Sequence, residues 1–198
     1  LPLRTRRQRQ MCIRDRDIEN GASKTFQGTL AALSATTNQL VTLTNKQTIN
    51  LWDENGNLIR RFPGHASSIE TLTFSPDGNA ILSGSHDKTA KLWSLEGDLL
   101  QDFSGLTSRV TSVAFSPKGN YILTGAGSYL PASFNRDSTA KLWNIEEQKI
   151  KNFIGHSQHV GTAVFAPDGK SFLTGSSDGT VKWWNINGGL KKSFAYGD

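Results

Sequence analysis

Three residue types that build a catalytic triad lie close together in this sequence: His65, Ser83 and Asp87. In a hydrolase, such a histidine takes the proton of the serine hydroxyl while the aspartate orients the imidazole ring. An equivalent set recurs further along the chain and consists of His156, Thr174 and Asp178. A tryptophan follows each aspartate by six residues. An active site is normally made once, so a set that recurs together with a tryptophan indicates a structural network and not a catalytic site.

Other kinds of chemistry find little support. His86 and His159 lie outside the two sets, and no second histidine or cysteine stands at ligand spacing from them, so we expect exposed loop residues and no metal site. The only cysteine is Cys12, so the rest of the chain can form neither a disulfide nor a thiolate site. Neither a glycine-rich phosphate loop nor a pair of catalytic carboxylates occurs. We therefore expect no enzymatic activity and no cofactor.

The elements that position these residues belong to a repeat. Four tryptophans are separated by 41, 50 and 41 residues, and each ends a similar run of letters: "QTINLW", "KTAKLW", "STAKLW" and "GTVKWW". Upstream of these runs, apolar residues alternate with polar ones as in half-buried strands, and Ser-Pro-Asp-Gly or Ser-Pro-Lys-Gly then marks a turn. Each copy predicts four antiparallel strands, which make one blade of a propeller. The third copy is longer by nine residues.

A family resemblance rests on these motifs. Gly-His, Ser-Pro-Asp-Gly, Asp and Trp recur in this order at fixed offsets within residues 17–198. On these motifs the chain resembles the WD40-repeat β-propeller family. The resemblance implies an all-β fold in which four-stranded antiparallel blades surround a central channel. We expect about four blades and, because the family usually has more, an incomplete ring.

The repeats divide the chain into expected segments. They are 1–16 (a disordered basic tail), 17–26 (the last strand of a preceding blade), 27–62 (blade 1), 63–103 (blade 2), 104–153 (blade 3, with an insertion at 126–134) and 154–198 (blade 4). Trp183 takes the position held by leucine in the other three copies, so we expect it to fill the core. Paired basic residues fall on predicted outer strands, where charge discourages edge pairing; they are Arg60, Arg61, Lys191 and Lys192.

The resemblance also implies a structural tetrad of histidine, hydroxyl, aspartate and tryptophan in each blade. Blade 2 supplies His65, Ser83, Asp87 and Trp93, and blade 4 supplies His156, Thr174, Asp178 and Trp184. Blade 3 supplies Thr124, Asp137 and Trp143, with Leu106 at the histidine position, and blade 1 retains Thr42 and Trp52, with Lys46 at the aspartate position. An indole N–H can only donate, so a buried tryptophan needs the hydroxyl as acceptor. We expect blades 1 and 3 to lack part of the network.

Charge is concentrated at the start of the chain. Residues 1–16 hold six arginines and one aspartate, a net charge of +5, which equals the net charge of the whole sequence. Residues 17–198 are therefore balanced, and we expect them to bind neither nucleic acid nor membranes. The run "MCIRDR" resembles translated linker sequence, so we interpret residues 1–16 as non-native; a genuine nucleic-acid-binding arm is the alternative. A cytoplasmic location is the default expectation.

Partner contacts are expected at one end of the propeller, the top face. Within the insertion of blade 3, apolar Tyr129, Leu130 and Phe134 stand in a segment expected to be exposed, where they could contact a partner; the alternative is a tolerated loop insertion without such a role. The resemblance adds the positions before each first strand and before each turn aspartate: Ser68, Arg109, His159, His86, Arg136 and Ser177. Their cationic and titratable members suit an acidic peptide or carboxylate. The sequence thus predicts a non-enzymatic scaffold that binds protein or peptide; the alternative is a regulatory or sensor propeller attached to an NTPase, kinase or other signalling enzyme.

Overall fold

The strands form four separate antiparallel sheets, each built from four strands that follow one another in the chain. The computed structural model describes residues 13–16, 23–26, 28–128 and 138–195. Blade 1 comprises β3 (Thr29–Leu33), β4 (Leu40–Thr44), β5 (Thr48–Trp52) and β6 (Leu58–Phe62). Blade 2 comprises β7 (Ile69–Phe74), β8 (Ala80–Ser85), β9 (Ala90–Ser94) and β10 (Leu99–Phe103).

The second half of the chain repeats this order. Blade 3 comprises β11 (Val110–Phe115), β12 (Tyr121–Ala126), β13 (Ala140–Asn144) and β14 (Ile150–Phe153). Blade 4 comprises β15 (Val160–Phe165), β16 (Ser171–Ser176), β17 (Thr180–Asn185) and β18 (Leu190–Ala195). The all-β prediction is therefore confirmed. The described ranges contain no helix of the length and apolarity that crossing a bilayer requires.

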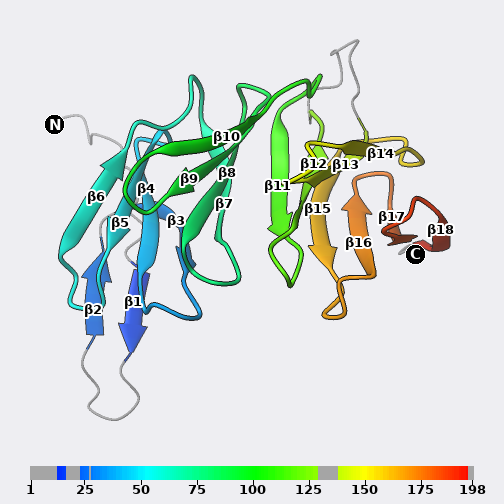
Figure 1. The fold of residues 1–198 in the computed structure, drawn as a ribbon. Coiled ribbons are helices and arrows are strands. Elements are labelled where there is room, and N and C mark those ends of the chain that lie inside the picture. The colour runs from blue at the N-terminus through cyan, green and yellow to red at the C-terminus, as the bar shows by residue number, and fades with distance from the viewer. Residues whose placement is uncertain (1–12, 17–22, 27, 129–137, 196–198) are drawn as a thin grey trace, which may run out of the picture.

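The blades stand side by side through their first strands (Figure 1). β3 packs on β7, β7 on β11 and β11 on β15, while β6, β10, β14 and β18 lie at the opposite edge of each sheet. The basic pairs Arg60–Arg61 and Lys191–Lys192 thus lie on outer edge strands, as predicted. Every first strand is bulged at its start, for example between Ile69 and Thr71. Because a bulge increases local twist, it helps each blade rotate relative to its neighbour.

Tight turns join the strands where the sequence places proline and glycine. Between β7 and β8, the amide of Gly78 donates to the carbonyl of Ser75 (2.9 Å), and Gly78 has a φ of 77°. Only glycine adopts that conformation without strain. The two Asn-Gly turns in the described ranges, at Asn55 and Asn187, also join neighbouring strands.

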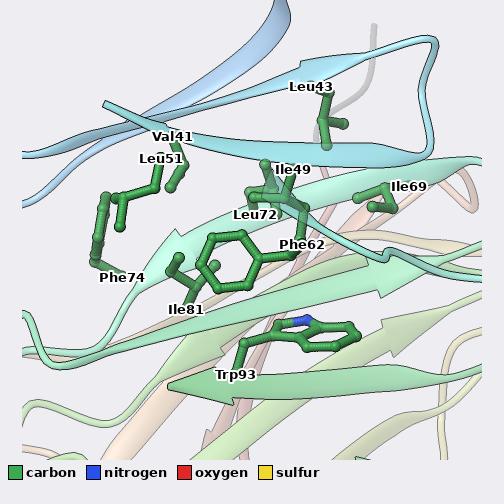
Figure 2. Close-up of a cluster of buried hydrophobic side chains, with 10 residues drawn as sticks. All are labelled: Val41, Leu43, Ile49, Leu51, Phe62, Ile69, Leu72, Phe74, Ile81 and Trp93. Atoms are coloured by element: carbon green, nitrogen blue, oxygen red, sulfur yellow. The ribbon is translucent and has the colours of Figure 1, made fainter. Parts of the chain in front are cut away.

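The core lies between blades. One cluster joins blade 1 to blade 2 and consists of Val41, Leu43, Ile49, Leu51, Phe62, Ile69, Leu72, Phe74, Ile81 and Trp93 (Figure 2). Equivalent clusters join blade 2 to blade 3 and blade 3 to blade 4. In each, a phenylalanine of the outer strand meets the tryptophan of the next blade edge to face, with ring centroids 6.3 Å apart for Phe62–Trp93 and 5.4 Å for Phe103–Trp143.

Small residues let the blades approach closely. A methyl group added at Gly84 in β8 would lie 2.6 Å from Cγ1 of Val110 and 2.9 Å from Cγ1 of Val113, both in blade 3. At Gly125 in β12, the same addition would lie 3.0 Å from Val160 of blade 4. At Gly84 and Gly125, contact with the following blade thus leaves little room for a side chain.

Within the fold, the structure differs from the prediction at residues 13–16 and at Trp183. Residues 13–16 were expected within a disordered tail, but β1 (Ile13–Arg16) pairs antiparallel with β2 (Ser23–Phe26). An isolated β2 would leave its backbone N–H and C=O groups unpaired, and the neighbouring stretch supplies the missing partner. Trp183 was expected in the core, but its side chain faces outward and is 38% exposed, because none of the four described four-stranded sheets packs over that face of β17.

Candidate functional site

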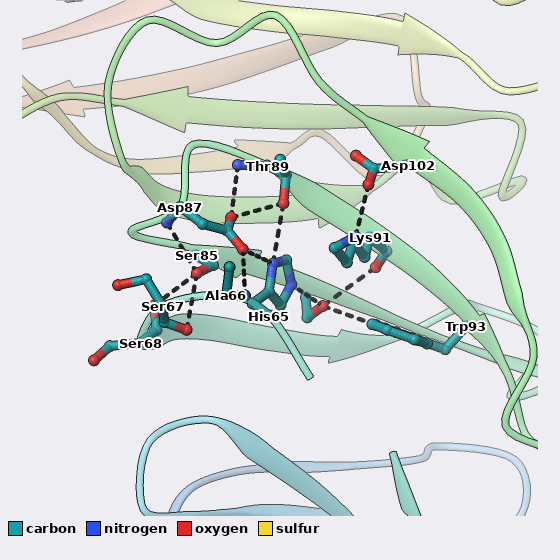
Figure 3. Close-up of polar contacts among 11 residues, drawn as sticks. His65, Ala66, Ser67, Ser68, Ser85, Asp87, Thr89, Lys91, Trp93 and Asp102 are labelled. Atoms are coloured by element: carbon teal, nitrogen blue, oxygen red, sulfur yellow. Dashed lines mark hydrogen bonds and ion pairs between the residues drawn. The ribbon is translucent and has the colours of Figure 1, made fainter. Parts of the chain in front are cut away.

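Blade 2 brings His65, Ser83, Asp87 and Trp93 into one continuous network (Figure 3). The Nδ1 atom of His65 lies 2.9 Å from Oδ2 of Asp87, and its Nε2 atom lies 2.7 Å from Oγ of Ser83. The indole N–H of Trp93 donates to the same Oγ over 2.9 Å. Because an ionised carboxylate can only accept, Nδ1 carries the ring proton and donates to Asp87, so the unprotonated Nε2 accepts from the hydroxyl of Ser83.

The protonation states agree with this direction of donation. Burial lowers the pKa of His65 and outweighs the opposing charge of Asp87, so the ring is neutral at pH 7. Burial would raise the pKa of Asp87, but the hydrogen bond from Thr89 and the interaction with His65 lower it overall. A neutral imidazole therefore lies beside an ionised carboxylate, and each polar atom finds a partner.

The aspartate ties two loops together. Oδ2 of Asp87 accepts from the backbone N–H of Ala66 (3.0 Å), and Oδ1 accepts from both the backbone N–H (3.0 Å) and the hydroxyl (2.7 Å) of Thr89. Thr89 was missed from the sequence, although a threonine follows two residues after the aspartate in "DKT" and again in "DGT". The loop that follows β6 is thereby fastened to the turn between β8 and β9.

Blade 4 repeats the arrangement. The Nδ1 atom of His156 lies 2.9 Å from Oδ2 of Asp178, its Nε2 lies 2.7 Å from Oγ1 of Thr174, and Trp184 donates to that oxygen over 2.8 Å. Burial would raise the pKa of Asp178, but hydrogen bonds from Thr180 and from the backbone of Ser157 lower it far below the ordinary value.

Blades 3 and 1 hold reduced versions. In blade 3, the indole of Trp143 donates to Oγ1 of Thr124 (3.0 Å), and Leu106 is buried in the same cluster as Trp143. In blade 1, Trp52 donates to Thr42 (2.9 Å). A methyl group at Gly28 would lie 2.6 Å from the Thr42 hydroxyl, so backbone fills the space beside it. Asp137 lies outside the described residues.

The geometry of these networks does not suit nucleophilic catalysis. His65 and Ser83 have the spacing of a triad, but the Ser83 side chain is fully buried and its oxygen already carries the indole hydrogen bond. A nucleophile needs an approach path for the substrate carbonyl, and this one has none. Within the described part of the chain, no three His, Cys, Asp or Glu side chains gather as a metal ion would require.

The candidate contact residues fall at one end of the blades in backbone-linked pairs. In blade 2, the N–H of His86 donates to the carbonyl of Ser68 (2.9 Å), which connects the start of β7 to the end of β8. The same bond links Ser177 to His159 in blade 4 (3.2 Å) and Gly127 to Arg109 in blade 3 (3.1 Å). Three neighbouring blades therefore present these strand ends on a fixed backbone. Tyr129, Leu130, Phe134 and Arg136 lie outside the described residues.

The side chains of these pairs differ in charge. Nε2 of His86 lies 2.7 Å from a carboxylate oxygen of Glu70, which the sequence did not single out. Burial, and to a smaller extent the charge of Arg109, lower the pKa of His159. His159 is therefore neutral at pH 7, and Arg109 carries the positive charge where blades 3 and 4 meet.

His159 is not the exposed loop residue that the sequence predicted, because only 7% of it is exposed. Its ring lies over Gly161, where a methyl group would stand 3.5 Å from Nε2, and Nε2 lies 3.2 Å from Oγ of Ser177. His86 is half-buried.

The family comparison agrees with this architecture. The model described as "WD domain, G-beta repeat" matches residues 56–94, 97–144 and 147–185, together more than half of the chain. Each match begins at the outer strand of one blade, or in the turn before it, and ends at the third strand of the next. No curated protein matches the chain. Three repeats match the family model, and the four sheets follow one another as propeller blades do; the chain therefore belongs to the WD40-repeat family.

Proposed function

We infer that this chain is a non-catalytic scaffold that binds a protein or peptide at the end of the blades bearing Ser68, His86, Arg109, His159 and Ser177. WD40 domains generally bind proteins, which supports the coarse assignment. The observation that carries the location is the row of three backbone-linked strand ends in blades 2 to 4. Side chains held on a rigid backbone lose little entropy when a partner binds, so such a row favours recognition.

The charge at this end favours an acidic group on the partner. Among the described members of the set, Arg109 supplies a guanidinium that donates through Nε to the carbonyl of Gly127 (3.1 Å). A guanidinium is planar and carries five N–H donors, a geometry that matches a carboxylate. His159 adds a neutral polar group, and Nε2 of His86 lies 2.7 Å from a carboxylate oxygen of Glu70. The preferred partner is thus a peptide with one or a few acidic residues, not a polyanion.

A peptide array displays defined sequences that differ in the number and position of Asp and Glu, and the full chain is applied to it. The double variant Arg109→Gln/Arg136→Gln is expected to lose the acidic sequences that the unchanged protein retains, with a loss that shrinks at high salt. The matched control, Arg60→Gln/Arg61→Gln, removes the same charge from the outer strand β6 and should keep binding. Equal losses in both double variants, or unchanged binding to every sequence, would refute this location.

A further inference from the structure

The outer strand of blade 3 is more regular than those of the other blades. In blades 1, 2 and 4, the outer strand carries a bulge near its start, and the extra residues are Ile59, Leu100 and Lys191. A bulge twists an edge strand and so discourages it from pairing with a further strand. β14 pairs with β13 over its whole length, Ile150–Phe153, without a shift of register. Its edge therefore remains open to pairing.

The turn before β14 accounts for this difference. In blade 2, the N–H of Ser94 donates to the carbonyl of Asp98, four residues further on (2.9 Å). In blade 3, the N–H of Asn144 donates to the carbonyl of Lys149, five residues further on (2.9 Å). The longer turn includes Gln148, which has a φ of 52°. The residue that blade 2 places in a bulge is thus placed in the turn by blade 3.

Backbone groups of β14 point outward along this edge. Residues of an antiparallel pair alternate between hydrogen-bonded and non-bonded positions, so the bond from Asn144 to Lys149 places Lys151 at a bonded position facing β13. The N–H and C=O groups of Ile150 and Asn152 therefore point away from β13. None of the described sheets places a strand on that side of β14. An extended segment of another protein can form a ladder with these groups.

Two cavities flank β14, one on each face of its sheet. Toward blade 2, a cavity of about 400 Å³ is lined by Ser104 and Ile150. Toward blade 4, a cavity of about 370 Å³ is lined by Lys151, Asn187 and again Ile150, which is 53% exposed. Both neighbouring blades take part, so the cavities lie within the row of blades. Successive side chains of an added strand point to opposite faces and would enter the two cavities in turn.

The side toward blade 4 favours an acidic side chain. Nζ of Lys151 donates to the carbonyl of Asn187 (3.0 Å), which uses one of the three N–H donors of the ammonium group. Lys149 lines the same cavity, and its hydrogen bond to Glu147 (2.9 Å) raises the pKa of its ammonium group. Two ammonium groups thus stand beside one carboxylate, and a carboxylate on the partner would balance them.

The side toward blade 2 favours an uncharged side chain. Ile150 gives its wall an apolar part, and the carboxylate of Asp102 is already paired with Nζ of Lys91 (2.6 Å). The other polar groups in this wall are neutral and belong to Gln101, Ser104, Asn144 and Gln148.

We propose that the edge of β14 binds an extended segment of a partner protein, in which acidic residues alternate with uncharged ones, as a fifth strand of blade 3. Backbone hydrogen bonds to Ile150 and Asn152 provide affinity, and the two cavities provide specificity for alternate side chains. This surface is separate from the strand ends that carry Arg109, and the proposal does not depend on peptide binding there.

Synthetic peptides test the proposal on the full chain. Peptides of about eight residues, enough to form a strand, alternate Glu with Val or Gln, and each is matched by a peptide of the same composition with its Glu residues in one block. Isothermal titration calorimetry should show tighter binding of the alternating peptides. In amide hydrogen exchange, the bound peptide should slow the exchange of Ile150 and Asn152 more than that of Lys151, which is already bonded to β13.

Asn152→Pro removes one outward N–H and no bond to β13, so it should weaken the binding of alternating peptides at least about fivefold. Ser193→Pro is the matched control, because it makes the same change one residue before the phenylalanine of the bulged strand β18, and it should bind as the unchanged protein does. Lys151→Gln should weaken binding about threefold, less so at high salt, and serves as a second test if Asn152→Pro does not fold.

The proposal is overturned if alternating and blocked peptides bind equally, if the bound peptide leaves the exchange of Ile150 and Asn152 unchanged, or if Lys151→Gln or a folded Asn152→Pro protein binds as the unchanged protein does. Peptides that Arg109→Gln/Arg136→Gln loses and Asn152→Pro keeps would lie at the other surface, and this outcome also overturns it.

Discussion

The contribution of the tetrad histidine to stability can be measured by making the same substitution at the tetrad threonine of blade 4 and at that of blade 3. Thr174 and Thr124 occupy equivalent positions in β16 and β12, and both are fully buried. The Thr174 oxygen serves two partners, the Trp184 indole at 2.8 Å and His156 at 2.7 Å. The Thr124 oxygen serves one such partner, the Trp143 indole at 3.0 Å.

Valine has nearly the shape of threonine but no hydroxyl, so each variant leaves its former partners unpaired. A buried polar group without a partner costs about 1–3 kcal/mol. Thr174→Val leaves two buried polar groups without a hydrogen-bond partner and should lower the free energy of unfolding by about 2–6 kcal/mol. Thr124→Val leaves one such group and should lower it by about 1–3 kcal/mol. The two variants should therefore differ by about 1–3 kcal/mol, which is the cost of leaving His156 without its hydrogen-bond partner. This difference corresponds to a change of roughly five- to 150-fold in the unfolding equilibrium constant.

Urea titrations followed by tryptophan fluorescence give the global free energy of unfolding. Repeat blades interact mainly with their neighbours, so amide hydrogen exchange in β12 and β16 should be measured as well, to detect a blade that opens by itself. Equal losses for the two variants, or a larger loss for Thr124→Val, would show that the histidine hydrogen bond adds nothing to blade 4 and that the reasoning is wrong.

Two further results are expected. Folding lowers the pKa of His65 from its ordinary value of 6.5, so the stability that the neutral ring contributes is complete above pH 6.5 and is lost as the pH falls through the lower folded value. The pKa of Asp87 is also lowered, so a second loss of stability follows below its ordinary value of 3.8. In pH-dependent urea titrations, His65→Leu should reduce the first step but not remove it, since the pKa of His159 is also lowered; an unchanged step would contradict the assignment. Gly84→Ala forces a methyl group to within 2.6 Å of the next blade and should cost more stability, measured by thermal unfolding, than Gly175→Ala, which meets only its own strand pair; the reverse order would contradict the packing argument.

The sequence predicts the strands and the tetrads well because both depend on local patterns. Alternation with a period of two decides which residues of β7 and β11 face a neighbouring sheet, and the turn glycines decide where those strands end. The tetrad residues recur at fixed offsets, so equivalent strands carry them to equivalent places. Thr89 shows the limit of this reasoning, because its role appears only when its hydroxyl is seen between His65 and Asp87.

The environment of a residue cannot be read from its position in a repeat when a neighbouring blade is missing. Trp183 stands where Leu92 and Leu142 are buried, yet it is exposed because the element that would cover it is not among the four sheets. His159 differs in the opposite direction: its place before β15 suggests an exposed loop residue, but its ring is buried and its Nε2 lies 3.2 Å from Oγ of Ser177. Both outcomes depend on contacts between blades or across a strand pair, which a single repeat does not encode.

The distribution of complete and reduced tetrads bears on how a partner would be bound. In blades 2 and 4, the histidine fastens the loop before the first strand to the turn after the second, and so fixes the strand ends that carry His86 and His159. Blade 3 has Leu106 in place of that histidine, so its strand ends are joined by the bond between Gly127 and Arg109 without the histidine–aspartate link. This blade also carries the inserted residues and the guanidinium. Two blades with a complete histidine–aspartate link therefore flank one whose Arg109 strand end is held by the backbone bond from Gly127 and by the bond from its own Nε to the same residue.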